Sequence, residues 1–395
     1  MRFPFLDRRS LLKYASVSGL ASLATACLSQ NVPTTATATA TAAAGIGQPA
    51  TAQPVQQPQA VTLKFQSGFS PQDLFHEMLI LWAKKVEELS GGRIKIDALP
   101  NNAVVPFTQI IDAVSAGTLD GGLSVPAYHF GKNRATSLFG TGPAIGMDAD
   151  MLLGWIYYGG GQALYDDLIQ KTLKLNVQSW FFGPMPTQPL GWFKKEVKSA
   201  DDFKGLKYRT VGLSADMFNE MGTSVQILAG GDIVPALQTG RIDAAEFNNP
   251  TSDKLLGFQD VSKILMVQSY HQPMECMEML FNKAKWDAFS APDKALFRYA
   301  TMAQSADFTW ICMARNSKDL EEYKTKFGVK VIKTPPSILK AQLEAWQKVI
   351  DRETKNAEFK KILDSQLAWA RRVGTLRAEI QVSQEMATEF FFGKK

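Results

Sequence analysis

Arg209 has the side chain and the setting to bind an anion. It lies in the strand-like run 206–211, where Lys207 and Arg209 point to one face and Tyr208 to the other. A guanidinium on a mostly apolar strand that faces a cleft can hold a carboxylate through two parallel hydrogen bonds. The alternative is a surface strand on which the arginine pairs with a nearby acid. Periodicity does not separate these two interpretations.

Glu246 is the second candidate, and its chemistry differs. It stands between Ala245 and Phe247 after a predicted strand. Carboxylate, amide and backbone carbonyl oxygens are the ligands that sodium and calcium prefer. Glu246, Gln188 and one backbone carbonyl could therefore hold such a cation. The alternative is a solvated or arginine-paired glutamate with no role in binding.

Known catalytic patterns give an enzyme little support. The chain has three histidines (His76, His129 and His271), and none has the spacing of a metalloprotease motif. No Gly-x-Ser-x-Gly nucleophile turn occurs. The net charge of +5 comes without basic clusters, which argues against a nucleic acid as partner.

An internal repeat indicates how these candidates are positioned. Residues 110–122 align without gaps to residues 233–245. Each copy reads as a short amphipathic helix that ends on a glycine, followed by a strand with an aspartate before small residues. The tails of the two copies, 124–129 with Tyr128 and 246–250, should face a common cleft, because ligands of open α/β sheets bind beyond the strand carboxyl ends.

The rest of the body alternates strand and helix. Residues 61–66 and 93–99 read as strands, and the segment 72–89 between them has helical periodicity before Gly91 and Gly92. This β-α-β order is typical of an α/β fold. The 335 residues after the first 60 exceed the size at which one core keeps growing, so two lobes are expected. Two lobes joined by a hinge, with a cleft between them, are typical of periplasmic binding proteins.

The amino terminus reads as an export address. Arg8 and Arg9 lie in a run typical of twin-arginine signals, and a modest apolar stretch follows up to residue 26. The ending Leu-Ala-Thr-Ala-Cys resembles a lipoprotein box, which predicts lipidation of Cys27; the alternative is an ordinary signal peptide cut nearby. Residues 27–60 contain no Lys, Arg, Asp or Glu and predict a disordered linker. The two later cysteines, Cys276 and Cys312, are predicted to be buried thiols rather than a disulfide.

Several segments in order resemble the solute receptors of tripartite ATP-independent periplasmic (TRAP) transporters. The resemblance runs from residue 63 to the end and is closest to the branch that binds 2-oxo acids such as pyruvate. Its main segments are 110–122, 157–164, 188–196, 203–209, 230–250, 256–258 and 282–286.

The resemblance implies a role for each matching residue. Arg209 matches the arginine that binds the ligand carboxylate. Gln188, Glu246 and the carbonyl of Phe247 match the ligands of a bridging metal ion, with sodium expected and calcium as the alternative. Gln188, Glu246, Tyr128 and Gln272 are also expected to contact the substrate. A small and a large membrane subunit are the implied partners, and the periplasm is the implied location, with a lipid anchor.

Three departures from the branch put the ligand in doubt. Phe247 stands where a tryptophan is common, Gln272 stands in place of a glutamate, and only Tyr128 stands in a run that is often tyrosine-rich. The loss of an acid and an indole predicts an altered charge and volume. The ligand could then be another carboxylate, such as a longer 2-oxo acid or the amino acid glutamate. Two rival functions are an exported enzyme on the same scaffold and a receptor that signals to a membrane sensor.

The expected organisation follows from these observations. Lobe 1 should comprise 61–184 with about 274–320, and lobe 2 should comprise 185–273. Residues 321–395 should form C-terminal helices, one with a stripe of Leu339, Leu343, Trp346 and Ile350. The resemblance implies a homodimer through these helices. The run 390–392 of three phenylalanines, which would be a costly exposed patch in a monomer, agrees with that expectation.

Overall fold

The computed structural model describes residues 60–393. The predicted signal (1–26), Cys27 and the predicted linker up to residue 59 lie outside the described residues. Within 60–393, no helix combines the length and the apolar character that crossing a bilayer requires. The same residues contain Cys276 and Cys312 as buried free thiols, which confirms that prediction.

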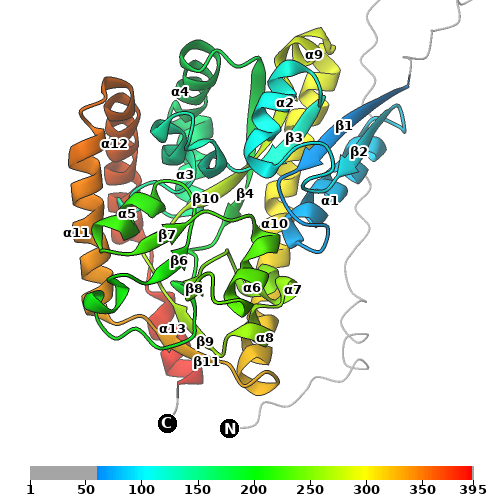
Figure 1. Ribbon diagram of the computed structural model, residues 1–395. Coiled ribbons are helices and arrows are strands. Elements are labelled where there is room, and N and C mark those ends of the chain that lie inside the picture. Colours follow the sequence, from blue (N-terminus) through cyan, green and yellow to red (C-terminus); the bar gives the residue numbers. More distant parts are fainter. Residues whose placement is uncertain (1–59, 394–395) are drawn as a thin grey trace, which may run out of the picture. The chain divides into compact units, whose positions relative to one another are not determined.

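A five-stranded mixed sheet, sheet A, carries the first part of the fold (Figure 1). Its order is β2-β1-β3-β10-β4; β1 is parallel to β2 and β3, whereas β10 is antiparallel to β3 and β4. The strands are β1 (Val61–Ser67), β2 (Ile94–Leu99), β3 (Gly121–Ser124), β4 (Val177–Met185) and β10 (Glu275–Asn282).

A second mixed sheet, sheet B, repeats this arrangement. Its order is β11-β9-β5-β8-β6-β7; β6 is parallel to β7 and β8, and β5 is antiparallel to β8 and β9. Read from β7, the strand directions match those of sheet A read from β2. The strands are β5 (Gly191–Phe193), β6 (Lys207–Arg209), β7 (Ser224–Gln226), β8 (Ala244–Ala245), β9 (Ile264–Val267) and β11 (Lys330–Lys333). The predicted two-lobed α/β fold is confirmed.

Helices cover both sheets. They are α1 (Leu74–Leu89), α2 (Ile110–Ala116), α3 (Ala149–Tyr158), α4 (Gly161–Asp166), α5 (Ser214–Glu220), α6 (Gly230–Gln238), α7 (Pro250–Leu256), α8 (Phe258–Val261), α9 (Lys283–Ala288), α10 (Ala291–Thr325), α11 (Pro336–Glu353), α12 (Ala357–Ile380) and α13 (Gln384–Phe392).

The two copies of the sequence repeat have the same local structure. Gly117 after α2 and Gly240 after α6 have φ of 81° and 73°, a left-handed conformation that glycine adopts at low cost. The aspartate that follows each glycine pairs with the neighbouring parallel strand through both its amide and its carboxylate. Asp120 donates to the carbonyl of Lys64 (2.9 Å) and accepts from its amide (2.6 Å), and Asp243 does the same with Lys207 (2.7 and 3.1 Å). The repeated aspartate therefore joins adjacent strands in each sheet.

The chain passes between the sheets through two extended connections. The first leads from β4 to β5 and the second from β9 to β10. They are hydrogen-bonded to each other: Gln188 N donates to the Gln272 carbonyl at 3.2 Å, and Thr187 Oγ1 donates to the Pro273 carbonyl at 3.3 Å. Residues on these connections therefore lie at the junction of the two lobes.

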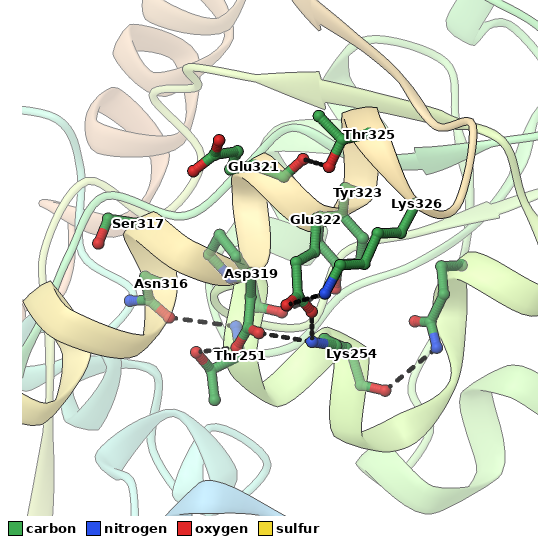
Figure 2. Close-up of polar contacts among 12 residues, drawn as sticks. Thr251, Lys254, Asn316, Ser317, Asp319, Glu321, Glu322, Tyr323, Thr325 and Lys326 are labelled. Atoms are coloured by element: carbon green, nitrogen blue, oxygen red, sulfur yellow. Dashed lines mark hydrogen bonds and ion pairs between the residues drawn. The ribbon is translucent and has the colours of Figure 1, made fainter.

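The long helix α10 forms a third link. It packs on β4 and α1 at sheet A and on α7 towards its C-terminal end (Figure 1). Figure 2 shows the polar contacts between α7 and α10. Lys254 of α7 pairs with Asp319 (2.7 Å) and with Glu322, and Thr251 Oγ1 donates to Asp319 at 2.8 Å.

The C-terminal part differs from the prediction in two respects. The span from residue 321 is not helical throughout, because β11 lies within it and pairs with β9 of sheet B. The buried face of α11 is also displaced from the predicted stripe: Ile338, Ala345, Trp346 and Val349 are buried, whereas Leu343 is 40 % exposed. The buried face includes Gln342, whose Nε2 donates to Ser269 Oγ at 2.9 Å, and a pattern of apolar residues alone does not reveal such a position.

Candidate functional site

A small cavity lies between the two sheets, next to the two connections. Its volume is about 10 Å³, close to the space of one water molecule. Its apolar wall comes from both lobes, and its polar lining contains five of the side chains described below. The lining residues are Phe69, Phe75, Val125, Tyr128, Met185, Gln188, Arg209, Val211, Phe247, Asn248, Gln272 and Glu275. The structure thus describes a closed cleft.

Arg209 is buried at the end of β6 and makes four hydrogen bonds, to Leu228 and Glu246. Its Nε and Nη2 atoms donate to the Leu228 carbonyl at 3.0 and 2.9 Å. Its Nη1 atom donates to the Glu246 carbonyl at 3.1 Å and to Glu246 Oε1 at 2.8 Å. A guanidinium has five N–H groups, so these contacts leave one N–H of Nη2 for a further partner. Burial excludes the surface-strand alternative, although pairing with an acid does occur.

Glu246 follows β8 and lies against Arg209 rather than in the cavity lining. Its Oε2 atom is buried and has no hydrogen-bond partner within the described structure. Burial raises the pKa of Glu246 from 4.5 to about 7, although Arg209 opposes that rise. A solvated glutamate is therefore excluded. Oε2 makes no hydrogen bond of normal geometry in the described structure, although the Thr210 hydroxyl lies close enough to the carboxylate to lower its pKa.

Gln188 and Glu275 form a buried pair beside these two residues. Gln188 Nε2 donates to Glu275 Oε2 at 2.9 Å, so the amide oxygen of Gln188 is turned away from the carboxylate. Gln188 Oε1 and Glu275 Oε1 are both buried without a partner in the described part of the chain. Burial and the charge of Glu246 raise the pKa of Glu275 from 4.5 to about 8.

Gln272, Tyr128 and Phe247 also lie at the cavity. Gln272 is 1 % exposed, and neither of its side-chain polar atoms has a partner among residues 60–393. Tyr128 packs on Phe69 and Phe107 with ring centroids 5.9 and 4.6 Å away, and burial raises the pKa of its hydroxyl, which stays neutral. The ring of Phe247 lies 5.6 Å from the Arg209 guanidinium carbon. The role of the Phe247 carbonyl stays a prediction.

Glu275 is the residue that the sequence argument missed. The glutamine at position 272 predicted a site with one acid fewer, yet Glu275 places a carboxylate in the same cavity from the start of β10. The loss of an acid at position 272 relative to the branch stays a prediction. A glutamate three residues after Gln272, at the start of a strand that leaves a lobe connection, was the available signal. The site keeps two carboxylates around one guanidinium.

The donor set fits a hard cation. The buried polar atoms without partners at this site, within residues 60–393, include three oxygens from Gln188, Glu246 and Glu275. Oxygen ligands with two carboxylates suit sodium or calcium and would not suit a thiophilic metal. No group of three or more His, Cys, Asp or Glu residues with metal-binding geometry occurs in the described residues, so amide and carbonyl oxygens would complete the set.

A larger hollow of about 410 Å³ lies elsewhere, between the start of α3, the β4–β5 connection and α10. None of its lining residues has a buried side-chain polar atom without a partner in the described structure. The chemistry therefore favours the smaller cavity.

Comparisons with known proteins agree with this architecture. Residues 65–357 match the model of bacterial extracellular solute-binding protein family 7. The monocarboxylate 2-oxoacid-binding periplasmic protein of Nostoc sp. is 32 % identical over 293 residues, which cover 74 % of this chain and 79 % of that protein.

Solved structures show the same fold. A TRAP transporter solute-binding protein from Bordetella bronchiseptica, with calcium and picolinate, aligns with a TM-score of 0.78 and 28 % identity over 84 % of this chain and 97 % of that one. A TRAP solute-binding protein from Colwellia psychrerythraea with calcium and pyruvate aligns with a TM-score of 0.76 and 25 % identity, over 84 % of this chain and 100 % of that one. Another from Pseudoalteromonas atlantica with sodium and pyruvate aligns with a TM-score of 0.77 and 24 % identity, over 85 % of this chain and 100 % of that one. The chain belongs to bacterial extracellular solute-binding protein family 7 and is a solute-binding receptor of the TRAP type, not an enzyme.

Proposed function

We propose that this receptor captures a small monocarboxylate, a 2-oxo acid such as pyruvate, together with a bridging sodium or calcium ion. The observation that carries the proposal is the set of buried oxygens of Gln188, Glu246 and Glu275, unpartnered within the described chain, beside the Arg209 guanidinium. The 2-oxoacid-binding relative from Nostoc and the calcium- and pyruvate-bound relative from Colwellia support the same ligand class.

Arg209 would hold the ligand carboxylate. In the closed cleft, one N–H of Nη2 has no acceptor among the described contacts and can donate to the ligand. A second N–H, on Nη1, becomes available if the Glu246 carboxylate turns from Arg209 to the cation. Glu246, Gln188 and the Phe247 carbonyl would hold the cation, which would supply positive charge to compensate the ligand carboxylate. Tyr128 and Gln272 would contact the ligand from the other lobe and from the β9–β10 connection. Apolar side chains on both lobes exclude water and so strengthen these charge-assisted contacts.

An amino acid is the second candidate ligand, and one observation favours it. Two buried carboxylates next to a guanidinium could receive an α-ammonium group in place of a metal cation. A second carboxylate, as in glutamate, would need another buried cation. Among the described residues, Arg209 is the only Lys or Arg side chain in the lining of the cavity, so the charge of a monocarboxylate is better compensated than that of a dicarboxylate.

The closed cleft would be the form that docks on the small and large membrane subunits of the transporter.

The proposal also includes a twin-arginine export signal and a lipid on Cys27, which together would hold the receptor at the outer face of a membrane. Labelling of cells with palmitate, followed by gel electrophoresis of the wild type and of Cys27→Ala, tests the lipid. The wild type should carry the label and the variant should not. A wild-type protein without label would contradict lipidation.

A homodimer through the C-terminal helices is part of the same proposal. Phe390, Phe391 and Phe392 of α13 are 78, 72 and 83 % exposed, which is a large apolar cost for an isolated chain. The relative from Bordetella is described as a dimer. Light scattering at micromolar concentration should give twice the mass of the chain, and a monomeric mass would exclude this part of the proposal.

Thermal unfolding with a panel of carboxylates tests the ligand class. A ligand at about 100 times its dissociation constant adds roughly 2.7 kcal/mol of stability. Pyruvate and other 2-oxo acids should raise the midpoint in the presence of sodium or calcium. If only amino acids raise it, and without a cation, the second candidate replaces the first.

A further inference from the structure

Glu275 makes a contact that sets the direction of a neighbouring amide. Gln188 Nε2 donates to Glu275 Oε2 at 2.9 Å, and both residues are at most 4 % exposed. Because a carboxylate accepts and does not donate, the amide must face it with its nitrogen. Gln188 Oε1 therefore points away from Glu275, and it has no partner within residues 60–393. Glu275 thus presents the oxygen of Gln188 as a ligand.

Glu275 also changes the charge of the site. A bound cation favours the ionised forms of Glu246 and Glu275, whose pKa values burial raises in the absence of a cation. In the cation-bound site Arg209 then contributes one positive charge, and Glu246 and Glu275 contribute one negative charge each. A bound monocarboxylate brings the sum to minus two. A divalent cation neutralises that sum, whereas sodium leaves one uncompensated negative charge in a buried cavity, which is costly.

We propose that Glu275 gives this site a preference for a divalent cation such as calcium over sodium. This inference rests on the proposed function, in which a cation and a carboxylate bind together. Glu275 acts in two ways: it supplies the second carboxylate, and it fixes the orientation of Gln188. With a neutral group at position 275, the sum with the ligand falls to minus one, and a monovalent cation neutralises it.

Gln272 offers a second position for the same charge. Its side chain lines the cavity, is 1 % exposed, and has two polar atoms without partners in the described structure. A carboxylate placed at 272 would reach the same cavity from the β9–β10 connection. The preference for a divalent cation should therefore rise with the number of carboxylates at 272 and 275.

The test is calorimetric titration of the purified protein with calcium or sodium chloride, with and without 1 mM pyruvate, at constant ionic strength. The wild type is compared with Glu275→Gln, Gln272→Glu and the double variant Gln272→Glu/Glu275→Gln. Glu196→Gln is the control, because Glu196 does not line the cavity and its carboxylate pairs with exposed Lys330. Circular dichroism and thermal unfolding show that each variant is folded.

We expect Glu275→Gln to weaken calcium binding by at least about tenfold and to leave sodium binding unchanged or tighter. The double variant should restore the calcium preference, and Gln272→Glu alone should increase it. A folded Glu275→Gln protein with the wild-type ratio of calcium to sodium affinity would overturn the inference, as would equal loss of both ions. Should Glu275→Gln not fold, an unchanged ratio in Gln272→Glu would overturn it. The wild-type titrations distinguish failure of this inference from failure of the proposed function. If pyruvate binds the wild type with the same affinity with and without a cation, the proposed cation bridge itself is wrong.

Discussion

Arg209 Nη1 and Glu246 Oε1 lie 2.8 Å apart, and both side chains are almost completely buried at the junction of the two lobes. A buried ion pair adds little net stability, because desolvation offsets much of the attraction. The role of this ion pair is to fix the position of the Arg209 guanidinium. The guanidinium is held by Glu246 and the Leu228 carbonyl, so it is in place before an anion arrives.

Replacement of Arg209 should abolish carboxylate binding without unfolding the protein. Arg209→Lys keeps the charge but cannot reproduce the two-sided contacts to Glu246 and Leu228. We expect pyruvate affinity to fall at least about a hundredfold, because the shorter lysine does not present the guanidinium N–H groups to the ligand carboxylate. Lys207→Ala on the same strand is the control, since Lys207 is exposed. Calorimetry checks both variants, and wild-type affinity in folded Arg209→Lys would contradict the role of Arg209.

Closure of the cleft should depend on the absence of a side chain at Gly212. A Cβ there would lie 2.1 Å from Thr141 Oγ1 on the opposite lobe, and φ is +64°. Gly212→Ala should therefore disfavour the closed form and weaken pyruvate binding by about tenfold or more, since affinity scales with the fraction of closed protein.

Gly205→Ala is the matched control for this variant. Gly205 also has a positive φ of +72°, but its Cβ would meet nothing within 4 Å in the described structure. It should lose stability without losing affinity. Gly212→Ala combined with Thr141→Ala should recover part of the affinity. Equal affinity losses in the two glycine variants would show that backbone strain, not closure, is the cause.

His271 should make the protein less stable as the pH falls. Burial lowers the pKa of His271 from 6.5 to about 3. Between these two pH values the unfolded chain therefore binds a proton at His271 and the folded chain does not. The stability from neutral His271 is present above pH 6.5 and is lost as the pH falls towards 3. Between pH 7.5 and 5 this loss is about 2 kcal/mol.

The comparison with His271→Gln isolates this effect. The buried acids, whose raised pKa values act in the opposite direction, are common to both proteins. Urea unfolding at pH 7.5 and 5 should show that the stability advantage of the wild type over the variant shrinks at the lower pH. A difference that does not depend on pH would mean that His271 titrates normally.

Lys254, which links α7 to α10, should contribute more to stability than Lys326, which pairs with Glu322 at the end of α10. Lys254 bridges Asp319 and Glu322 and is 25 % exposed, whereas Lys326 reaches only Glu322 within the described residues and is 63 % exposed (Figure 2). Lys254→Met should lower the thermal midpoint by roughly 2 °C or more, and Lys326→Met should have a smaller effect. Similar shifts in the two variants would contradict the bridging role of Lys254.

Much of the fold follows from local sequence. The helix-glycine-strand-aspartate repeat predicted two similar lobes, because helix caps and strand starts depend on residues close in sequence. Strand β11 was missed since its partner β9 lies more than 60 positions earlier, and four residues of partly exposed strand resemble a linker between helices. The face of α11 was misplaced because a buried Gln342 does not belong to an apolar pattern.

The candidate site could be predicted in part. Arg209 ends strand β6, Glu246 follows the adjacent strand β8, and the resemblance added Gln188. Glu275 was missed because the lobe connections bring it to the cavity, and its one sequence signal is its place three residues after Gln272 at the start of a strand. The pairing of Arg209 with Leu228 also depends on the register of β6 and β7, which the sequence leaves open.

The linkage between pyruvate and cation binding tests the central claim most directly. Calorimetric titration with pyruvate, in the presence and absence of calcium, measures the factor by which the cation tightens the ligand. Titration with calcium, in the presence and absence of pyruvate, must return the same factor, because coupling is reciprocal. The proposed site predicts a shared factor of about ten or more in both titrations. Pyruvate affinity that is the same with and without calcium or sodium would contradict it.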